Sequence, residues 1–519
     1  MDTFLVAHHN IYTRVPALFD VLWREGGVLS ETTRLCAFIH TRLAMAITHF
    51  IAFTGLLAIA QAANPTHYPP SQSSINNFTV VLNGTGAPGI FNSSTSPDSV
   101  YGVYNWCNMP HVRKREYKTP PKNYTLEYVE VIQRHHKRTP YASNTFFKED
   151  VSWSCGGEGA RNGAESAKGA SSNVPSVQWQ ALSDSTNPWV NTVGPGFVNS
   201  TCQFPQITSS GLDDSVTHGN DLRSVYFPRL SLSSKFDSNK VSIRVTNNVI
   251  TSQVASGLLA GLFPTLSSSS NIPVQIQSST YDSLEPTYSC PKANTLKSQF
   301  TTGADGAVWQ THLTAVKSLY AKLDSVSGID PTDGGWHASL DHYYDNLSAK
   351  QCHEKKLPCS LNDTSLCVSQ DEANTVYRLG SYEYSYLYRD APLSTTYSVL
   401  KYGAWMLELK AHIQAHIDGT SEVKYLHNIA HDGSISPLLG FLQIEQMVWP
   451  GMGSEVVFEL YSSGSKKSKQ NSIRVLWSGQ PMHTSTPLGV LDMVPVEDFF
   501  AYIDSMVGSG SELLAACNS

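Results

Sequence analysis

Four positively charged residues and three histidines of this chain stand in or directly after three apolar runs. The stretch RHHKRTP, residues 134–140, follows one apolar run, Arg244 lies in a second, and His431-Asp432 follows a third. Guanidinium groups repel each other unless an anion lies among them, and their forked donors match the oxygens of a phosphoryl group. These residues therefore predict a phosphoryl ligand.

The same residues have the types that covalent phosphoryl transfer needs. A histidine such as His135 can attack phosphorus, which splits one difficult displacement into two easier ones. Arg134 and Arg138 would hold the equatorial oxygens and stabilise the transferring group. Asp432, next to His431, would protonate the leaving oxygen and later accept a proton from water. This scheme needs no metal and no other cofactor.

A structural role is the competing interpretation for these charged residues. Arg134 and Arg138 would then pair with acidic neighbours such as Glu130, and we expect Lys137 at a rim that faces solvent. Arg244 lies in an apolar strand, where an unpaired buried charge costs several kcal/mol, so it needs an anion as partner.

A metal-dependent hydrolase is a further interpretation. Its ligands would be His135, His136, His431 and Asp432. The arginines between these ligands oppose a cation, so we expect no metal here.

The segments before these residues have strand character. TLEYVEVIQ, 125–133, and KVSIRVTN, 240–247, are rich in β-branched and apolar residues, and residues 424–442 are predicted to form a strand, a turn and a helix. If the three strands belong to one sheet, their C-terminal ends meet at one edge, where open α/β sheets bind ligands. The charged side chains would converge at that edge.

Helical patterns fill the middle of the chain. They cover residues 210–230, 249–264 and 304–328, and parts of 333–350, 371–388 and 393–417. The aromatic residues of the last segment are expected in the core. Two further strands, 454–463 and 472–482, are expected to form a hairpin. Strands near both ends and helices between them predict an α/β fold with a largely helical insertion.

The composition excludes one class of function. The formal net charge is −7 over 519 residues and the isoelectric point is near 6.2. Nucleic-acid binding needs many exposed Lys and Arg over one face, so we expect no nucleic-acid partner. The basic cluster at 134–138 is local.

The N-terminal part has the pattern of an address. Residues 45–63 contain an apolar run that ends in Ala60-Gln61-Ala62, as in a cleaved secretory signal peptide. Residues 1–44 have no clear role, and we expect a start codon assigned too far upstream. An uncleaved signal anchor is the alternative, which the short apolar run disfavours. The C-terminal SGSELLAACNS lacks the hydrophobic run of a lipid-anchor signal, so no stable membrane insertion is expected after cleavage.

Cysteines and sequons agree with the secretory pathway. After Cys36, eight cysteines remain, which predicts up to four disulfides in an oxidising compartment. Cys352, Cys359 and Cys367 lack the spacing of a zinc site. N-linked glycans are expected at Asn77, Asn83, Asn92, Asn123, Asn199, Asn346 and Asn362. The chain is expected to be secreted, or held at a cell wall or in a vacuolar lumen.

Four segments resemble one known family. RHHKRTP is similar to the Arg-His-Gly-x-Arg-x-Pro signature of the histidine acid phosphatases, the secreted, fungal-type branch of the histidine phosphatase superfamily. Residues 431–442 resemble its distal His-Asp motif, residues 207–226 its Thr-x-x-Gly…Gly-x-x-Leu-Arg helix, and residues 243–248 the strand that supplies its third arginine. The resemblance extends from about residue 105 to about residue 505.

The resemblance implies a fold and an activity. The fold would be a phosphoglycerate mutase-like three-layer α/β/α sandwich with an inserted, mostly helical cap. The activity would be metal-independent hydrolysis of small phosphomonoesters, best at acid pH, with phytate as one substrate among many. His135 would be the nucleophile and Asp432 the proton donor. The phosphate ligands would be Arg134, Arg138, Arg244 and His431.

The domain boundaries that follow are these. Residues 105–150, 205–265 and 425–510 would form the catalytic α/β domain, 151–204 and 266–424 the inserted cap region, and 64–104 a Ser/Asn/Pro-rich N-terminal arm.

One residue departs from the family signature. His136 stands where the family has glycine, a residue used where backbone approaches a ligand closely. A side chain there would narrow the pocket, add a phosphate donor or accompany a lost activity. Asn247-Asn248 also differs from the pattern usual after the third arginine. A protein of the same fold that binds phosphorylated ligands without turnover is therefore the alternative function.

Overall fold

The computed structural model describes residues 65–91, 98–140, 151–155, 182, 184–192, 196, 199–266, 272–465 and 468–519. The expected extension 1–44, the signal 45–63, the sequon at Asn92 and most of the segment 151–204 lie outside these residues.

The strands are β1 (Tyr124–Arg134), β2 (Val241–Val245), β3 (Tyr425–Ala430), β4 (Glu455–Ser463), β5 (Gln470–Trp477), β6 (Gln480–Pro481) and β7 (Val494–Pro495). The helices before β3 are α2 (Phe78–Asn83), η1 (Asp98–Val100), η3 (Pro188–Thr192), α4 (Ser209–Leu230), α5 (Val249–Leu262), α6 (Pro291–Thr301), α7 (Ala307–Ala315), α8 (Lys317–Ser327), α9 (Asp341–Cys352), α10 (Gln370–Ser385), η4 (Tyr386–Asp390) and α11 (Ser394–Ile417). After β3 follow α12 (Asp432–Phe441), α13 (Val496–Val507) and α14 (Gly510–Cys517).

The strands form one mixed sheet in the order β2-β3-β1-β4-β5-β6, with β7 beside β5. β2, β3 and β1 are parallel, and Arg134 of β1 stands opposite Ala430 of β3. β4 and β5 form the expected antiparallel hairpin. The three strands expected to carry the charged residues are therefore confirmed as neighbours, and their C-terminal ends share one edge.

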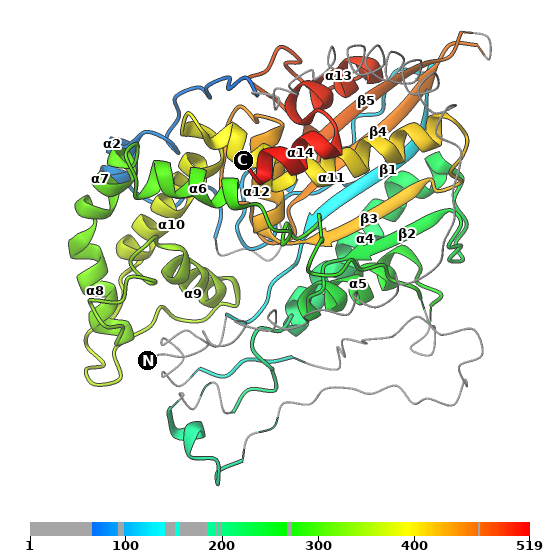
Figure 1. Cartoon of the computed structure of the whole chain (residues 1–519). Coiled ribbons are helices and arrows are strands. Elements are labelled where there is room, and N and C mark those ends of the chain that lie inside the picture. Colours follow the sequence, from blue (N-terminus) through cyan, green and yellow to red (C-terminus); the bar gives the residue numbers. More distant parts are fainter. Residues whose placement is uncertain are drawn as a thin grey trace, which may run out of the picture. The chain divides into compact units, whose positions relative to one another are not determined.

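Alternate residues of β1 pack on opposite faces of the sheet, as the two-residue period of a strand requires. Val129 and Val131 contact the core under α4 and α5. Tyr128 and Ile132 contact the core under α11, α12 and α13. The sheet is thus covered by helices on both faces (Figure 1), and the α/β class is confirmed.

The helices of the middle segment have two environments. α8, α9 and α10 build a hydrophobic core of their own, which also includes Trp106 and Trp449. α11 packs on the sheet instead, and its expected core residues Tyr397, Tyr402 and Trp405 are buried there. α11 lies in the range 266–424 assigned to the insertion, so part of that range covers the sheet. The helices α2, α6, α13 and α14 were not predicted.

Polar residues begin the helices that approach the functional edge. The side chain of Thr208 accepts a hydrogen bond from the Gly211 N–H at the start of α4. Asn248 accepts one from the Ile250 N–H at the start of α5. Capping of this kind satisfies backbone donors that a helix leaves open. Asn248, which departs from the family pattern, therefore has a structural role.

Four disulfides join the eight cysteines after Cys36, as expected. The pairs are Cys107–Cys352, Cys155–Cys202, Cys290–Cys517 and Cys359–Cys367. The three cysteines considered for zinc are all in these pairs. Among the described residues, no helix is long and apolar enough to cross a membrane.

Most sequons of the described residues are accessible, but one is not. Asn346 is fully buried in α9, and its side chain donates to the backbone oxygen of His342. A glycan at this position is incompatible with the folded chain. The exposed acceptors are Asn83, Asn123, Asn199 and Asn362.

Candidate active site

His135 follows directly after β1, and its backbone N–H donates to the Ala430 oxygen of β3 at 3.0 Å. Its ring Nδ1 lies 2.9 Å from the backbone oxygen of His136. Because a carbonyl only accepts, Nδ1 carries the ring proton, and Nε2 of the neutral ring keeps its lone pair. That lone pair is what a nucleophilic histidine needs.

The surroundings of His135 keep its ring neutral. Burial first, and then the charges of Arg134, Arg138 and His431, lower the pKa of His135 well below its ordinary value. The hydrogen bond to the His136 oxygen opposes this effect only in part. His135 is therefore unprotonated at neutral pH.

Arg134, which is buried, and Asp432, which is partly exposed, form an ion pair beside His135. Nη2 of Arg134 lies 3.0 Å from Oδ2 of Asp432, and Nη1 donates to the Pro450 oxygen at 2.5 Å. The guanidinium stands 4.6 Å from the centre of the Trp106 ring, a cation–π contact. Its Nε is also buried, and no described residue accepts from it.

Asp432 is held as a carboxylate. Burial raises its pKa, but the charge of Arg134, the indole N–H of Trp449 at 2.7 Å, and the charges of Arg138 and His431 outweigh burial. The pKa of Asp432 therefore lies below its ordinary value. Asp432 begins α12, whose N-terminal amides favour an anion at the same place.

Arg138 is oriented from the helical region. Its Nη2 and Nη1 lie 2.9 and 3.3 Å from the two carboxylate oxygens of Asp345 on α9, and Nη1 also donates to the Thr139 oxygen at 3.0 Å. The fork of the guanidinium thus matches a carboxylate of the neighbouring core. This contact aims Arg138 and couples the site to α9.

His431 faces His135 with ring centres 5.5 Å apart. Its Nε2 lies 2.9 Å from the Thr246 hydroxyl and 3.7 Å from Oε1 of Glu285. Burial lowers the pKa of His431, and Asp432 opposes this while Arg138 and Arg134 add to it. The structure thus brings five of the six predicted residues together: Arg134, His135, Arg138, His431 and Asp432.

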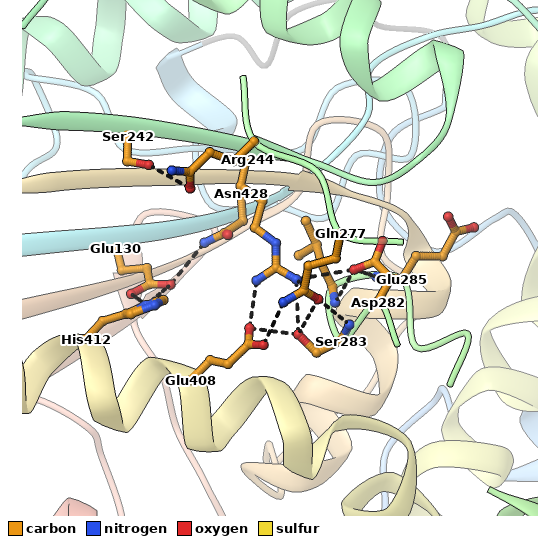
Figure 2. Close-up of polar contacts among 12 residues, drawn as sticks. Glu130, Ser242, Arg244, Gln277, Asp282, Ser283, Glu285, Glu408, His412 and Asn428 are labelled. Carbon is orange, nitrogen blue, oxygen red and sulfur yellow. Dashed lines mark hydrogen bonds and ion pairs between the residues drawn. The ribbon is translucent and has the colours of Figure 1, made fainter. Parts of the chain in front are cut away.

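Arg244, the sixth residue, has contacts of its own. Its guanidinium donates to Glu408 of α11 at 2.7 Å and to Gln277, Asp282 and Ser283 at 2.7, 3.2 and 3.0 Å (Figure 2). The buried charge did need an anion, but carboxylates of this chain supply it. The structure therefore does not place Arg244 with the five residues around His135.

His136 is directed away from this cluster. Its ring is fully buried, Nε2 lies 3.2 Å from Nδ1 of His218, and Nε2 of His218 lies 2.9 Å from the Glu455 carboxylate. Gly453, with φ +70°, leaves the space that the ring fills, because a Cβ there would lie 2.5 Å from Cε1 of His136. The His136 side chain, which replaces the family glycine, thus packs in the interior and does not enter the cluster around His135.

The expectation that Lys137 lies at a solvent-facing rim was wrong, and Glu130 is not the partner that the competing interpretation gives to the two arginines. Lys137 is buried, with Nζ 2.9 Å from the Asp214 carboxylate, and does not face solvent. Glu130 contacts His412, Tyr128 and Asn428, and these contacts include neither Arg134 nor Arg138. Burial next to the strand end explains both, because each buried charge has been given a specific partner.

The metal interpretation does not fit this geometry. His136 bonds to His218 while Asp432 bonds to Arg134, so the four proposed ligands do not converge. Among the described residues, no group of three His, Cys, Asp or Glu side chains is arranged to hold a metal ion.

Sequence reasoning missed several residues that complete the site. Trp449 and Trp106 hold the Arg134–Asp432 pair, and Asp345 holds Arg138. Glu285 and Thr246 contact His431. Thr246 could have been found from its position at the end of a predicted strand. The other residues could not, because they come from distant segments that have no periodic pattern.

Comparison with known proteins identifies one family and several relatives. The family model of the histidine phosphatase superfamily (branch 2) matches residues 125–478, a range that contains all six predicted residues. Counting factor 60 of Dictyostelium discoideum is 27% identical over 390 residues, which cover 72% of this chain and 85% of the relative. 2-phosphoxylose phosphatase 1 of Danio rerio is 24% identical over 430 residues, 77% and 81% of the two chains.

Solved structures of similar proteins have weaker similarity. The multiple inositol polyphosphate phosphatase of Bifidobacterium longum matches with a TM-score of 0.49 and 11% identity, over 82% of this chain and 99% of the other. Hafnia alvei phytase matches with a TM-score of 0.48 and 14% identity, over 77% and 99%. The family relationship rests on the family model, which matches residues 125–478.

Proposed function

The chain belongs to the histidine phosphatase superfamily (branch 2), and we propose that it is a secreted phosphomonoester hydrolase that forms a covalent phosphohistidine at His135 without a metal. The observation that carries this proposal is the 2.9 Å hydrogen bond from Nδ1 of His135 to the His136 oxygen. It leaves the Nε2 lone pair available beside two arginines, which is the arrangement that attack on phosphorus requires.

The first step transfers the phosphoryl group. Nε2 of His135 attacks phosphorus, the N–P bond forms and the ester P–O bond breaks. Arg134, Arg138 and His431 hold the phosphoryl oxygens, and the arginines supply the positive charge that metal ions supply in other phosphoryl-transfer sites. The leaving oxygen takes a proton from Asp432. The His136 oxygen stabilises the Nδ1–H of the phosphorylated ring, which is positively charged.

The second step releases phosphate. Water attacks phosphorus, its proton passes to the Asp432 carboxylate, the N–P bond breaks, and His135 returns as a neutral ring. Proton and phosphate balance over both steps, with one ester and one water giving one alcohol and one phosphate.

Asp432 links this cycle to acid pH. Its pKa is lowered in the free protein, so only acid pH protonates a large fraction of it. A bound phosphate competes for the Arg134 donor and adds negative charge beside the carboxyl, and both effects raise the pKa of Asp432 towards the donating form. Burial and the neighbouring charges lower the pKa of His135 as well, which favours its neutral, nucleophilic form.

The substrate class and the location are proposed from the relatives, the disulfides and the sequons. Two relatives named 2-phosphoxylose phosphatase support a small sugar phosphate as the first substrate to test. Four disulfides and exposed sequons support passage through the secretory pathway. The protein is expected to be a glycoprotein that is secreted or held in a cell wall or vacuolar lumen.

The test is hydrolysis of an aryl phosphate by the secreted protein between about pH 3 and about pH 8, with and without chelator. His135→Ala is expected to lose turnover by about a thousandfold or more, as for other lost nucleophiles. His427→Gln is the matched control, because its imidazole is equally buried on the same sheet and bonds to Gln133.

A phosphoenzyme trapped from the wild-type protein, and absent in His135→Ala, would support the intermediate. Loss of activity with chelator would contradict the metal-free mechanism. A folded wild-type protein that binds vanadate without any turnover would instead favour the alternative, a phosphate-binding member of the fold.

A further inference from the structure

Arg244 clamps the segment 277–285 to the sheet. The backbone of Gln275 pairs with β2 through Val245 and Ile243, at 2.9 and 2.8 Å. Beyond it, the Arg244 guanidinium binds the side chains of Gln277, Asp282 and Ser283 on one side and Glu408 of α11 on the other (Figure 2). These contacts give the segment a defined position between β2 and α11.

The clamp presents Glu285 to the active site. The backbone N–H of Glu285 donates to the Asp282 carboxylate at 3.4 Å, which anchors the residue next to the clamp. Its Oε1 lies 3.7 Å from Nε2 of His431, and the side chain is 36% exposed. A second carboxylate therefore stands beside the proposed phosphate ligand, and it faces solvent in part.

We propose that Glu285 is a specificity-determining residue that selects monoesters with an uncharged, hydroxyl-bearing leaving group against substrates that carry further phosphates. This inference rests on the proposed function, because it concerns the same site. A hydroxyl of the leaving group can donate to the Glu285 carboxylate. A second phosphate adds roughly two negative charges near it at neutral pH, and like charges a few ångströms apart repel.

The charge of Glu285 depends on its neighbours. The groups that face Glu285 are Asp282 on the same segment, His431 at the start of α12 and the Thr246 hydroxyl, which hydrogen-bonds to its carboxylate. Arg244 on β2 and Glu408 on α11 lie behind Asp282. Burial, and then the charge of Asp282, raise the pKa of Glu285 above its ordinary value. As pH falls through that pKa the carboxylate is neutralised, so the selection is stronger at neutral than at acid pH.

The experiment compares kcat/KM for glucose 6-phosphate, whose leaving group is an uncharged sugar with free hydroxyls, and for inositol hexakisphosphate in the full-length protein at about pH 4.5 and about pH 7. We expect Glu285→Gln to raise the ratio in favour of inositol hexakisphosphate by about tenfold at the higher pH, and less at the lower pH. Glu285→Lys should shift the ratio further in the same direction.

Glu445→Gln is the matched control. Its carboxylate also stands near a histidine, with Oε2 3.8 Å from Nδ1 of His483, and it is 49% exposed. Its removal should leave the ratio unchanged.

Two results would overturn the inference. An unchanged ratio in Glu285→Gln and Glu285→Lys would show that the carboxylate does not select. An equal loss of turnover for both substrates would show that it acts in the chemical step. If the wild-type protein turns over neither substrate, the proposed function fails, and displacement of bound vanadate by phosphate or by inositol hexakisphosphate provides the same ratio for the same variants.

Discussion

The placement of His136 can be tested through Gly453, which packs on its ring. A Cβ at Gly453 would lie 2.5 Å from Cε1 and 2.7 Å from Nδ1 of His136. The ring cannot yield easily, because it is fully buried and hydrogen-bonded to His218 at 3.2 Å. Gly453→Ala should therefore force the ring or the backbone to move.

The expected cost has two parts. Gly453 has φ +70°, and the left-handed conformation costs a non-glycine residue about 1–2 kcal/mol. Overpacking in a filled core adds about 1–3 kcal/mol. Gly453→Ala should thus lower the free energy of unfolding by about 2–5 kcal/mol.

The assay is urea unfolding of Gly453→Ala in the wild-type and in the His136→Ala background. Only the overpacking part should disappear in the second background, which leaves about 1–2 kcal/mol and a coupling of about 1–3 kcal/mol. Gly489→Ala is the control for the backbone part, because Gly489 has φ +61° and nothing lies within 4 Å of a Cβ there.

Equal costs of Gly453→Ala in both backgrounds would refute the reasoning. The His136 ring would then not fill this space. It would be free to face the phosphate site, and His136→Ala should raise KM for phosphate esters.

Two other changes test the site and the frame that holds it. Trp449→Phe removes the N–H that donates to Asp432 at 2.7 Å, so the pKa of Asp432 should rise. Turnover needs protonated Asp432, and kcat/KM therefore falls at high pH where Asp432 is deprotonated. In the variant this fall should occur at higher pH than in the wild-type protein. An unchanged profile would mean that the indole does not stabilise the carboxylate. The double variant Cys290→Ser, Cys517→Ser removes a disulfide between residues 227 positions apart. Because the disulfide restricts the unfolded chain, urea unfolding should show a free energy of unfolding lower by about 5 kcal/mol. A decrease below about 1 kcal/mol would contradict this account.

The amino-acid sequence by itself determined the strands and the residues that end them. β-branched and apolar runs predicted β1, β2 and β3, and the motifs at 134–138 and 431–432 followed two of these runs directly. Parallel strand ends meet at one edge, so the meeting of His135 with His431 required only the sheet order. Local pattern and local spacing contain this information.

Contacts between residues far apart in the sequence were decided by the tertiary structure alone. Arg244 binds Glu408, 164 residues away, and His136 bonds to His218, 82 residues away. Eight cysteines allow 105 pairings, and the fold selects one of them. A buried charge must find a partner, but which side chain it finds depends on how separate segments pack. For this reason the sequence predicted an anion for Arg244, and only the folded chain showed that the anions are its own Glu408 and Asp282.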